Sequence, residues 1–243
     1  MFLIDTLFPK VCRYCGDPFR EGLSNVLCAA CFDSIQPYEG VRCDHCGIAL
    51  AEGAFSGSVR PRCRDCGNRD YFLGETRAFG SYAGPLRLAH HAFKFEGMEA
   101  LAEVLAEKMT GESSAPFWNG VEALVPVPLS AERERERGYH PARLLAGAIA
   151  KRAYKPMKEP LVKTVSTPAQ MSLSRQKRLT NPKGAYRYIG SQPPPTQVVL
   201  VDDVLTTGAT LEECAKVLRQ AGVSVVKAVV YGRTPHDFEA QAL

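Results

Sequence analysis

Four Cys-x-x-Cys pairs lie in the first 66 residues of this 243-residue chain and hold eight of its nine cysteines. The gaps between successive pairs are only 12, 11 and 16 residues long. Two thiolates on one tight turn reach the same ion, and a second pair across a short ribbon completes a tetrahedral site. We therefore predict two structural Zn²⁺ ions, because a redox role does not explain four pairs. The predicted ligands are Cys12, Cys15, Cys28, Cys31, Cys43, Cys46, Cys63 and Cys66.

The order of the cysteine pairs leaves two arrangements of the zinc ions open. Sequential pairing places Cys12–Cys31 on one ion and Cys43–Cys66 on the other, and a cross-braced arrangement is the alternative. In both, the thiolate count is complete, so we expect closed sites and an exposed His45 that is not a ligand. Because we assign the cysteines to metal and find no export signal, we expect a reducing cytoplasm.

The N-terminal stretch "MFLIDTLFPK" is apolar but lacks a basic region and a cleavage site. We expect a short helix that docks on the body, with a membrane-surface contact as the alternative. No apolar run approaches the roughly 20 residues that span a bilayer.

Residues 1–75 carry a net charge of −2 and residues 76–243 carry +6, so the second part attracts phosphates.

From about residue 76 the cysteines give way to alternating strand and helix patterns. Strands are predicted at 121–129, 196–204 and 223–232, and helices at 98–109, 141–152 and 210–222. Alternation at these lengths indicates an α/β fold, with a parallel sheet covered by helices. We therefore divide the chain into a zinc-binding module at 1–75, which includes the short N-terminal helix, and an α/β domain at 76–243.

The stretch "VVLVDDVLTTGATL" (198–211) places two acids at the end of an apolar strand, followed by a Thr/Gly loop and a helix. Ligands of open parallel sheets bind at this edge. Amide N–H groups at a helix N-terminus enclose a phosphate, helped by the helix dipole. Asp202 and Asp203 suit sugar hydroxyls or metal-bound water, so the whole string predicts a ribose 5-phosphate site. The predicted phosphate loop comprises Thr206, Thr207, Gly208, Ala209 and Thr210.

This stretch resembles the phosphoribosyl pyrophosphate (PRPP) motif of type I phosphoribosyltransferases. Paired cysteines followed by "YAGPLRLAHHAFKFEG", "LVPVPLSAERERERGY", "RQKRLTNPKGAY" and this motif are similar to the ComF family. The resemblance implies a double zinc ribbon and a type I phosphoribosyltransferase-like domain that binds PRPP with Mg²⁺. It also implies a role in natural transformation, in which such proteins act with DNA-uptake proteins on incoming single-stranded DNA at the cytoplasmic side of the membrane.

Membership of this family does not by itself imply a base-transfer reaction, so an active phosphoribosyltransferase is the alternative. Such an enzyme transfers ribose 5-phosphate from PRPP to a nucleobase-like acceptor, with Mg²⁺ on the diphosphate. It needs a segment that grips the acceptor, but only "RTPHDFEAQAL" follows the last predicted strand in this sequence. We therefore expect the zinc module to cover the site, and we assign no catalytic residue.

The resemblance assigns the diphosphate to the "VPVPL" turn and to Arg133 and Arg137. These two arginines are four residues apart and share a face of the predicted helix. The family commonly has R-G-F-N-Q where this chain has "RGYHP", so His140 and Pro141 replace two amide side chains. We therefore expect the hydrogen bonds of those amides to differ here, and proline also lacks a backbone donor.

Three other basic residues are candidates for contacts with phosphate or with a DNA backbone: Lys94, Arg175 and Arg178. The two histidines of "HHAFKFEG" receive no role, since a lone histidine is usually structural. Cys214 falls on the apolar face of the helix after the phosphate loop. We expect it to be a buried small hydrophobic residue and not a nucleophile.

Overall fold

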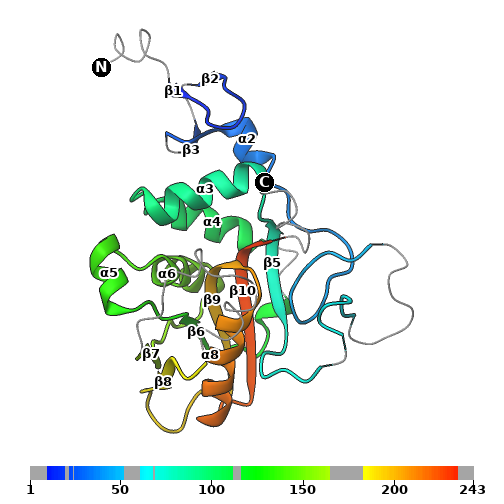
Figure 1. The fold of residues 1–243 in the computed structure, drawn as a ribbon, viewed down its shortest axis with the longest axis vertical. Helices are drawn as coiled ribbons and strands as arrows, with labels where there is room; N and C mark the ends of the chain where they lie inside the picture. The colour runs from blue at the N-terminus through cyan, green and yellow to red at the C-terminus, as the bar shows by residue number, and fades with distance from the viewer. Residues whose placement is uncertain are drawn as a thin grey trace.

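The computed structural model describes residues 10–19, 22–23, 25–51, 61–67, 69–111, 116–164 and 183–234. The short helix expected at the start of the chain lies outside these residues, and so do Arg175 and Arg178. The described part contains a four-stranded sheet with helices on both faces, and two cysteine-rich ribbons, one packed on a helix and the other beside the edge of the sheet (Figure 1).

The central sheet is parallel throughout, as the α/β prediction requires. In spatial order its strands are β5 (Thr76–Ser81), β10 (Val225–Arg233), β9 (Gln197–Leu205) and β6 (Ala123–Pro126). Parallel neighbours need long crossovers, and helices supply them. These helices are α3 (Gly84–Phe95), α4 (Leu101–Met109), α5 (Ala131–Arg137), α6 (Pro141–Ala153) and α8 (Ala209–Gln220). A separate antiparallel hairpin is formed by β7 (Leu161–Lys163) and β8 (Tyr186–Tyr188).

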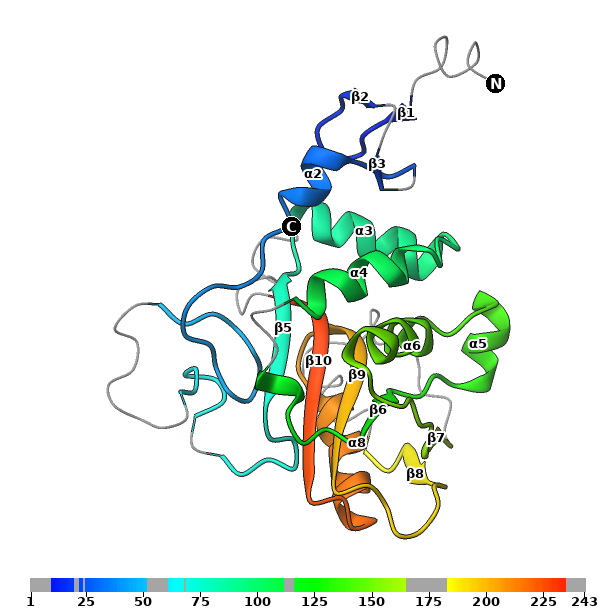
Figure 2. The ribbon, with the colours of Figure 1, turned by 180° about the vertical axis from the view of Figure 1, so that it is seen from behind.

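Strand β9 is completely buried over its apolar half, and its residues alternate between two hydrophobic cores. Val199 and Val201 join the core built by α3, α4 and α6, whereas Val198 and Leu200 join the core built by α8 and the β7–β8 hairpin. Figures 1 and 2 show α8 and α6 on opposite faces of the sheet. Because the alternation continues along the strand, Asp202 and Asp203 meet different neighbours.

The two ribbons pack against different parts of the domain. The first ribbon (residues 10–33) contains β1 (Lys10–Val11), β2 (Pro18–Phe19), β3 (Gly22–Leu23), β4 (Leu27–Cys28) and α2 (Ala29–Asp33). Its Leu27 and Phe32 share a core with Leu86 and Phe93 of α3. The cysteines of the second ribbon (residues 42–67) belong to the other core, together with Ala78 of β5.

The sequence predicts the elements around the phosphate loop better than those before it. Helices α4, α6 and α8 and strands β6, β9 and β10 occur where their patterns place them, within a few residues. Two differences matter. Strand β9 runs to Leu205, one residue beyond its predicted end, so the acids lie in its C-terminal part with two strand residues after them. Helix α3 and strand β5 were not predicted, although Leu86, His90 and Phe93 are buried at helical spacing.

Candidate functional site

Each ribbon gathers its own four cysteines, as sequential pairing predicts. Within each tetrad, Cys12–Cys31 and Cys43–Cys66, the sulfur atoms all lie within 4.8 Å of one another. The Sγ atoms of Cys15 and Cys28 are 3.9 Å apart, and those of Cys46 and Cys63 are 3.7 Å apart. Four sulfurs about 2.3 Å from one zinc ion stand about 3.8 Å from each other. Both tetrads therefore fit a tetrahedral Zn²⁺ ion, and they do not form a cross-braced arrangement.

Backbone groups prepare these turns for metal. Gly16, Gly47 and Gly67 follow a pair and donate their N–H to the carbonyl of its first cysteine, at 2.9, 2.8 and 2.9 Å. Gly47 has a φ of 70°, and a Cβ there would lie 2.8 Å from the backbone nitrogen of Ala78. Burial raises the pKa of Cys12, but neighbouring backbone N–H groups outweigh it and lower the pKa to about 6. The backbone at Cys12 thus favours the thiolate that zinc binds.

His45, expected to be exposed, is buried between the second ribbon and the rest of the domain. Its ring stacks on Tyr71 with 3.5 Å between the ring centroids. Burial lowers its pKa to about 4, so the ring is neutral at pH 7. The expectation of exposure was wrong because the second ribbon packs into a core instead of projecting into solvent.

Asp203 is a buried, ionised carboxylate held by three donors. Its Oδ1 accepts the N–H of Val204 at 2.7 Å, and its Oδ2 accepts a hydrogen bond from His90 Nε2 at 3.2 Å. The ammonium of Lys94 binds the same Oδ2. Burial alone would raise the pKa of Asp203, but the charge of Lys94 and the bond from His90 hold it well below its usual value. Asp203 is therefore charged and neutralised by Lys94.

His90 orients Asp203, a role that the sequence did not predict. Tyr82 Oη lies 2.6 Å from His90 Nδ1, on the far side of the ring from Asp203. Burial lowers the pKa of His90, so we assign the neutral tautomer in which Nε2–H donates to Asp203 and Nδ1 accepts from Tyr82. His90 lies four residues before Lys94, and this spacing on one helix face was the available signal.

Asp202 has a different environment on the same strand. Its Oδ1 accepts the backbone N–H of Asp203 at 2.9 Å. Burial raises its pKa to about 8, and the charge of Asp203 adds to this shift. Lys163 and Tyr186 of the β7–β8 hairpin interact with it electrostatically. Near neutral pH the acid pair thus holds one proton, and it offers both donor and acceptor oxygens to a ligand.

The predicted phosphate loop joins β9 to α8, and all of its residues are partly exposed. Gly208 is the N-cap of α8 with a φ of 79° and has no side chain to cap the helix, while Thr207 Oγ1 accepts the N–H of Ala209 at 3.4 Å. The N–H groups of a first helical turn have no partner inside the helix. Glu212 accepts the N–H groups of Phe72 and Leu73, at 2.6 and 3.2 Å, which anchors this turn. The loop therefore presents amide donors beside the acid pair.

Arg133 and Arg137 of α5 each share a neighbouring side chain with one acid of the pair or its counter-ion. The Arg137 guanidinium lies 5.4 Å from the ring centroid of Phe95, and Lys94 Nζ lies 5.9 Å from the same centroid. Arg137 and Lys94 therefore share the Phe95 ring as a neighbour. Arg133 interacts electrostatically with Lys163, which also interacts with Asp202. The structure thus brings Lys94 onto Asp203 directly, and it connects the two arginines to the acids through Phe95 and Lys163.

His140, at a position where the family pattern has an amide side chain, caps the start of α6. It is the N-cap of α6, with ring nitrogens 3.1 Å from the N–H nitrogen of Arg143 and 3.0 Å from that of Leu129. A neutral imidazole accepts at only one of the two nitrogens. Pro141 occupies the first helical turn, where a missing N–H costs nothing. The substitution thus leaves the start of α6 intact.

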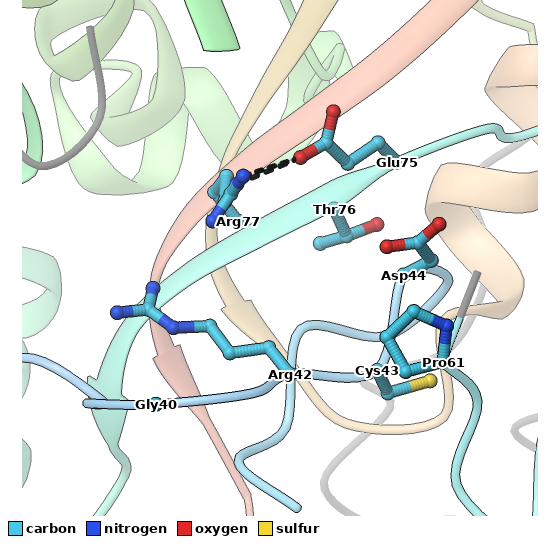
Figure 3. Close-up of a pocket in the computed structure, with 8 residues that line it drawn as sticks. All are labelled: Gly40, Arg42, Cys43, Asp44, Pro61, Glu75, Thr76 and Arg77. Atoms are coloured by element: carbon cyan, nitrogen blue, oxygen red, sulfur yellow. Dashed lines mark hydrogen bonds and ion pairs between the residues drawn. The ribbon is translucent and has the colours of Figure 1, made fainter. Parts of the chain in front are cut away.

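A cavity of about 160 Å³ lies between the second ribbon and β5, and not at the acid pair (Figure 3). Its charged lining is mixed and contains two arginines, Arg42 and Arg77, and two acids, Asp44 and Glu75. Arg77 is paired with Glu75 at 2.8 Å. We assign it no ligand, because this lining does not favour either sign of charge. Separately, no helix in the described ranges has the length and apolar character needed to cross a membrane.

Comparisons with known proteins match both parts of the chain. A family model described as "Double zinc ribbon domain" matches residues 3–67, and one described as "Phosphoribosyl transferase domain" matches residues 142–240. The described sheet and the paired tetrads agree with these two matches.

Three curated relatives are similar over most of their length. Competence protein F of Haemophilus influenzae is 33% identical, covering 84% of this chain and 88% of that protein. Competence protein ComFC of Bacillus subtilis is 25% identical, covering 87% and 90%. DNA utilization protein YhgH of Escherichia coli O157:H7 is 26% identical, covering 93% and 98%. The chain therefore belongs to the ComF family of competence protein F, with a double zinc ribbon before a phosphoribosyltransferase domain.

Proposed function

We propose that this protein acts in DNA uptake during natural transformation, where it handles incoming single-stranded DNA, and that its phosphoribosyltransferase-like domain binds PRPP. The names of its relatives, competence protein and DNA utilization protein, support the first part. The acid pair beside a helix N-terminus supports the second. We further propose a cytoplasmic location at the inner face of the membrane, together with DNA-uptake proteins.

The observation that carries the PRPP proposal is the environment of Asp203. A buried carboxylate is costly unless it is paired, and here its counter-ion is a lysine whose side chain is 25% exposed. Such a cation can move aside, whereas the strand that bears Asp203 is fixed in the core. In the proposed complex the ribose hydroxyls replace Lys94 at the acid pair, and residues 206–210 hold the 5-phosphate.

The cations around the acids would then serve the diphosphate of PRPP. Lys94, once displaced, joins Arg133 and Arg137 near that group, where guanidinium and ammonium donors form charge-assisted hydrogen bonds. Mg²⁺ bound to the diphosphate supplies further charge neutralisation through oxygen ligands. Asp202 and Asp203 are the described residues suited to hold the metal's water ligands. No catalytic residue is proposed.

Calorimetric titration with PRPP and Mg²⁺ tests this site. We expect the wild-type protein to bind, and the double variant Asp202→Asn/Asp203→Asn to lose at least about 10-fold in affinity, because hydrogen bonds to charged groups contribute about 1.5–3 kcal/mol each. Asp70→Asn, at an exposed carboxylate outside the site, is the matched control and should bind like the wild type. Equal binding by the double variant and the wild type rejects the assignment.

Binding of single-stranded DNA is tested separately, by fluorescence anisotropy over a range of salt concentrations. Residues 76–243 carry the positive charge of the chain, so we expect an affinity for oligothymidylate that falls steeply as salt rises. An affinity that is independent of salt would argue against contacts with the DNA backbone. The result of this experiment does not affect the interpretation of the PRPP titration, because the two experiments use different ligands.

A further inference from the structure

Phe95 is an exposed aromatic residue in an unusual position. It is the last residue of α3 and retains 46% of its surface exposure, although large apolar side chains usually lie inside. Two cations flank its ring: the guanidinium of Arg137 lies 5.4 Å from the centroid and Lys94 Nζ lies 5.9 Å from it. An aromatic face with cations beside it is the arrangement that holds nucleobases and their phosphates.

The end of α3 that carries Phe95 is fixed from two directions. The hydroxyl of Tyr139, from the segment between α5 and α6, donates to the carbonyl of Phe93. The Arg13 guanidinium of the first ribbon binds both oxygens of Glu96, at 2.7 and 2.8 Å. Phe95 is therefore exposed on a rigid support, which reduces the entropy that a ligand would have to offset on stacking.

Phe95 also lies next to the acid pair. His90 donates to Asp203 and its ring is 6.3 Å from that of Phe95, centroid to centroid. Lys94 likewise contacts both Asp203 and Phe95. The aromatic ring is thus separated from the carboxylate by the width of one side chain. A ribose whose hydroxyls bind Asp203 would have its C1′ substituent in this neighbourhood.

We propose that Phe95 is a stacking platform for a nucleobase. The inference rests on the proposed ribose-phosphate site, and it names the chemistry of the second ligand group: the planar face of a base, bound on Phe95 between Arg137 and Lys94. The base has two candidate sources, a nucleoside 5′-phosphate bound in the ribose-phosphate site and the single-stranded DNA that the protein handles. Both present the same π-face, and stacking tolerates any base.

The test compares ligands that contain a base with ligands that contain none. Affinities of the full-length, zinc-loaded protein are measured for ribose 5-phosphate, AMP, PRPP with Mg²⁺, and a short oligothymidylate. Phe95→Leu removes the π-face but keeps an apolar side chain, and Phe95→Trp keeps a π-face. Tyr154→Leu is the control, because Tyr154 is an aromatic residue that is 94% exposed at the far end of α6. Zinc content and thermal unfolding establish that each variant is folded.

We expect Phe95→Leu to lower the affinity for AMP, for oligothymidylate or for both by about 10-fold, which is within the range of base–aromatic stacking. Ribose 5-phosphate and PRPP, which have no base, should bind the variant unchanged, and Phe95→Trp should retain the wild-type affinities. If only the affinity for AMP falls, the base belongs to a nucleotide. If only the affinity for the oligonucleotide falls, the base belongs to DNA. If neither affinity changes, the platform is rejected while the PRPP site stands. If the wild type binds no ribose phosphate at all, the proposed site itself fails, and this inference with it.

Discussion

Two regions of this protein gather negative charge in buried positions, and they neutralise it in different ways. In the second ribbon four buried cysteines face one metal position, and their spacing fits a tetrahedral ion. At the end of β9 two acids share one proton, and the charge of Asp203 is balanced by the side chain of Lys94. A four-coordinate zinc site has no open ligand position, whereas a lysine can be displaced.

This difference assigns a role in folding to the zinc ribbon and a role in ligand binding to the acid pair. A closed tetrathiolate site contributes to folding and leaves nothing for a substrate. The acid pair is held by a rigid strand and by His90, but its counter-ion is partly exposed, so a ligand can exchange with it. We expect changes at the ribbon to affect the amount of folded protein, and changes at the acid pair to affect what the folded protein binds.

The largest effect is expected for Cys46→Ser in the second ribbon. Structural zinc contributes about 10–16 kcal/mol to folding in small domains, comparable with the whole stability of a typical domain, about 5–15 kcal/mol. Since Cys46 lies in a core shared with β5 and β9, its loss should unfold more than the ribbon. Thermal unfolding and zinc content by mass spectrometry measure this.

Cys15→Ser, at an exposed ligand of the first ribbon, should also lose one zinc ion but leave the sheet folded. Equal damage by both changes would remove the distinction.

An intermediate effect is expected for Lys94→Met, which leaves Asp203 without its counter-ion. Removing one partner of a buried ion pair costs about 3 kcal/mol, because the remaining charge is uncompensated. Lys151→Met is the control, since Lys151 pairs with Glu103 at 3.2 Å on the exposed surface and should cost less than about 1 kcal/mol. Urea unfolding at pH 7 measures both. A Lys94→Met protein as stable as the control would mean that Asp203 does not depend on Lys94.

The smallest effect is the pH dependence caused by Asp202. Its folded pKa of about 8 exceeds its unfolded value, so the folded state keeps a proton that the unfolded state releases. Its contribution to stability is therefore fully present below pH 4, decreases as pH rises, and is lost once pH passes about 8. Asp202→Asn should flatten this slope and stabilise the protein by about 1–2 kcal/mol at pH 8, as relief of strain at a functional site often does. An unchanged slope would show that Asp202 ionises normally.

The sequence was most informative where residues act locally. The spacing of Cys12 and Cys15, or of Cys43 and Cys46, sets two thiolates on one turn regardless of the rest of the fold. The Thr/Gly loop that begins at Thr206 likewise predicts that a helix follows it. These features follow from chain geometry over a few residues, so a single sequence suffices to predict them.

The environment of the acid pair could not be predicted in this way. His90 and Lys94 are more than 100 residues from Asp203, and α3 was not recognised as a helix. His45 was expected in solvent for a similar reason, since its burial depends on how the second ribbon packs beside Tyr71. Long-range packing decides these cases, and no local pattern contains it. The predicted contacts of Arg175 and Arg178 fall outside the described residues.

The most direct test of the account is a crystal structure of the protein with PRPP and Mg²⁺. We predict that the ribose hydroxyls contact Asp202 and Asp203, that the 5-phosphate lies on residues 206–210, and that Lys94 has left Asp203 for the diphosphate. A complex in which PRPP binds elsewhere while the Lys94–Asp203 ion pair remains intact would contradict it.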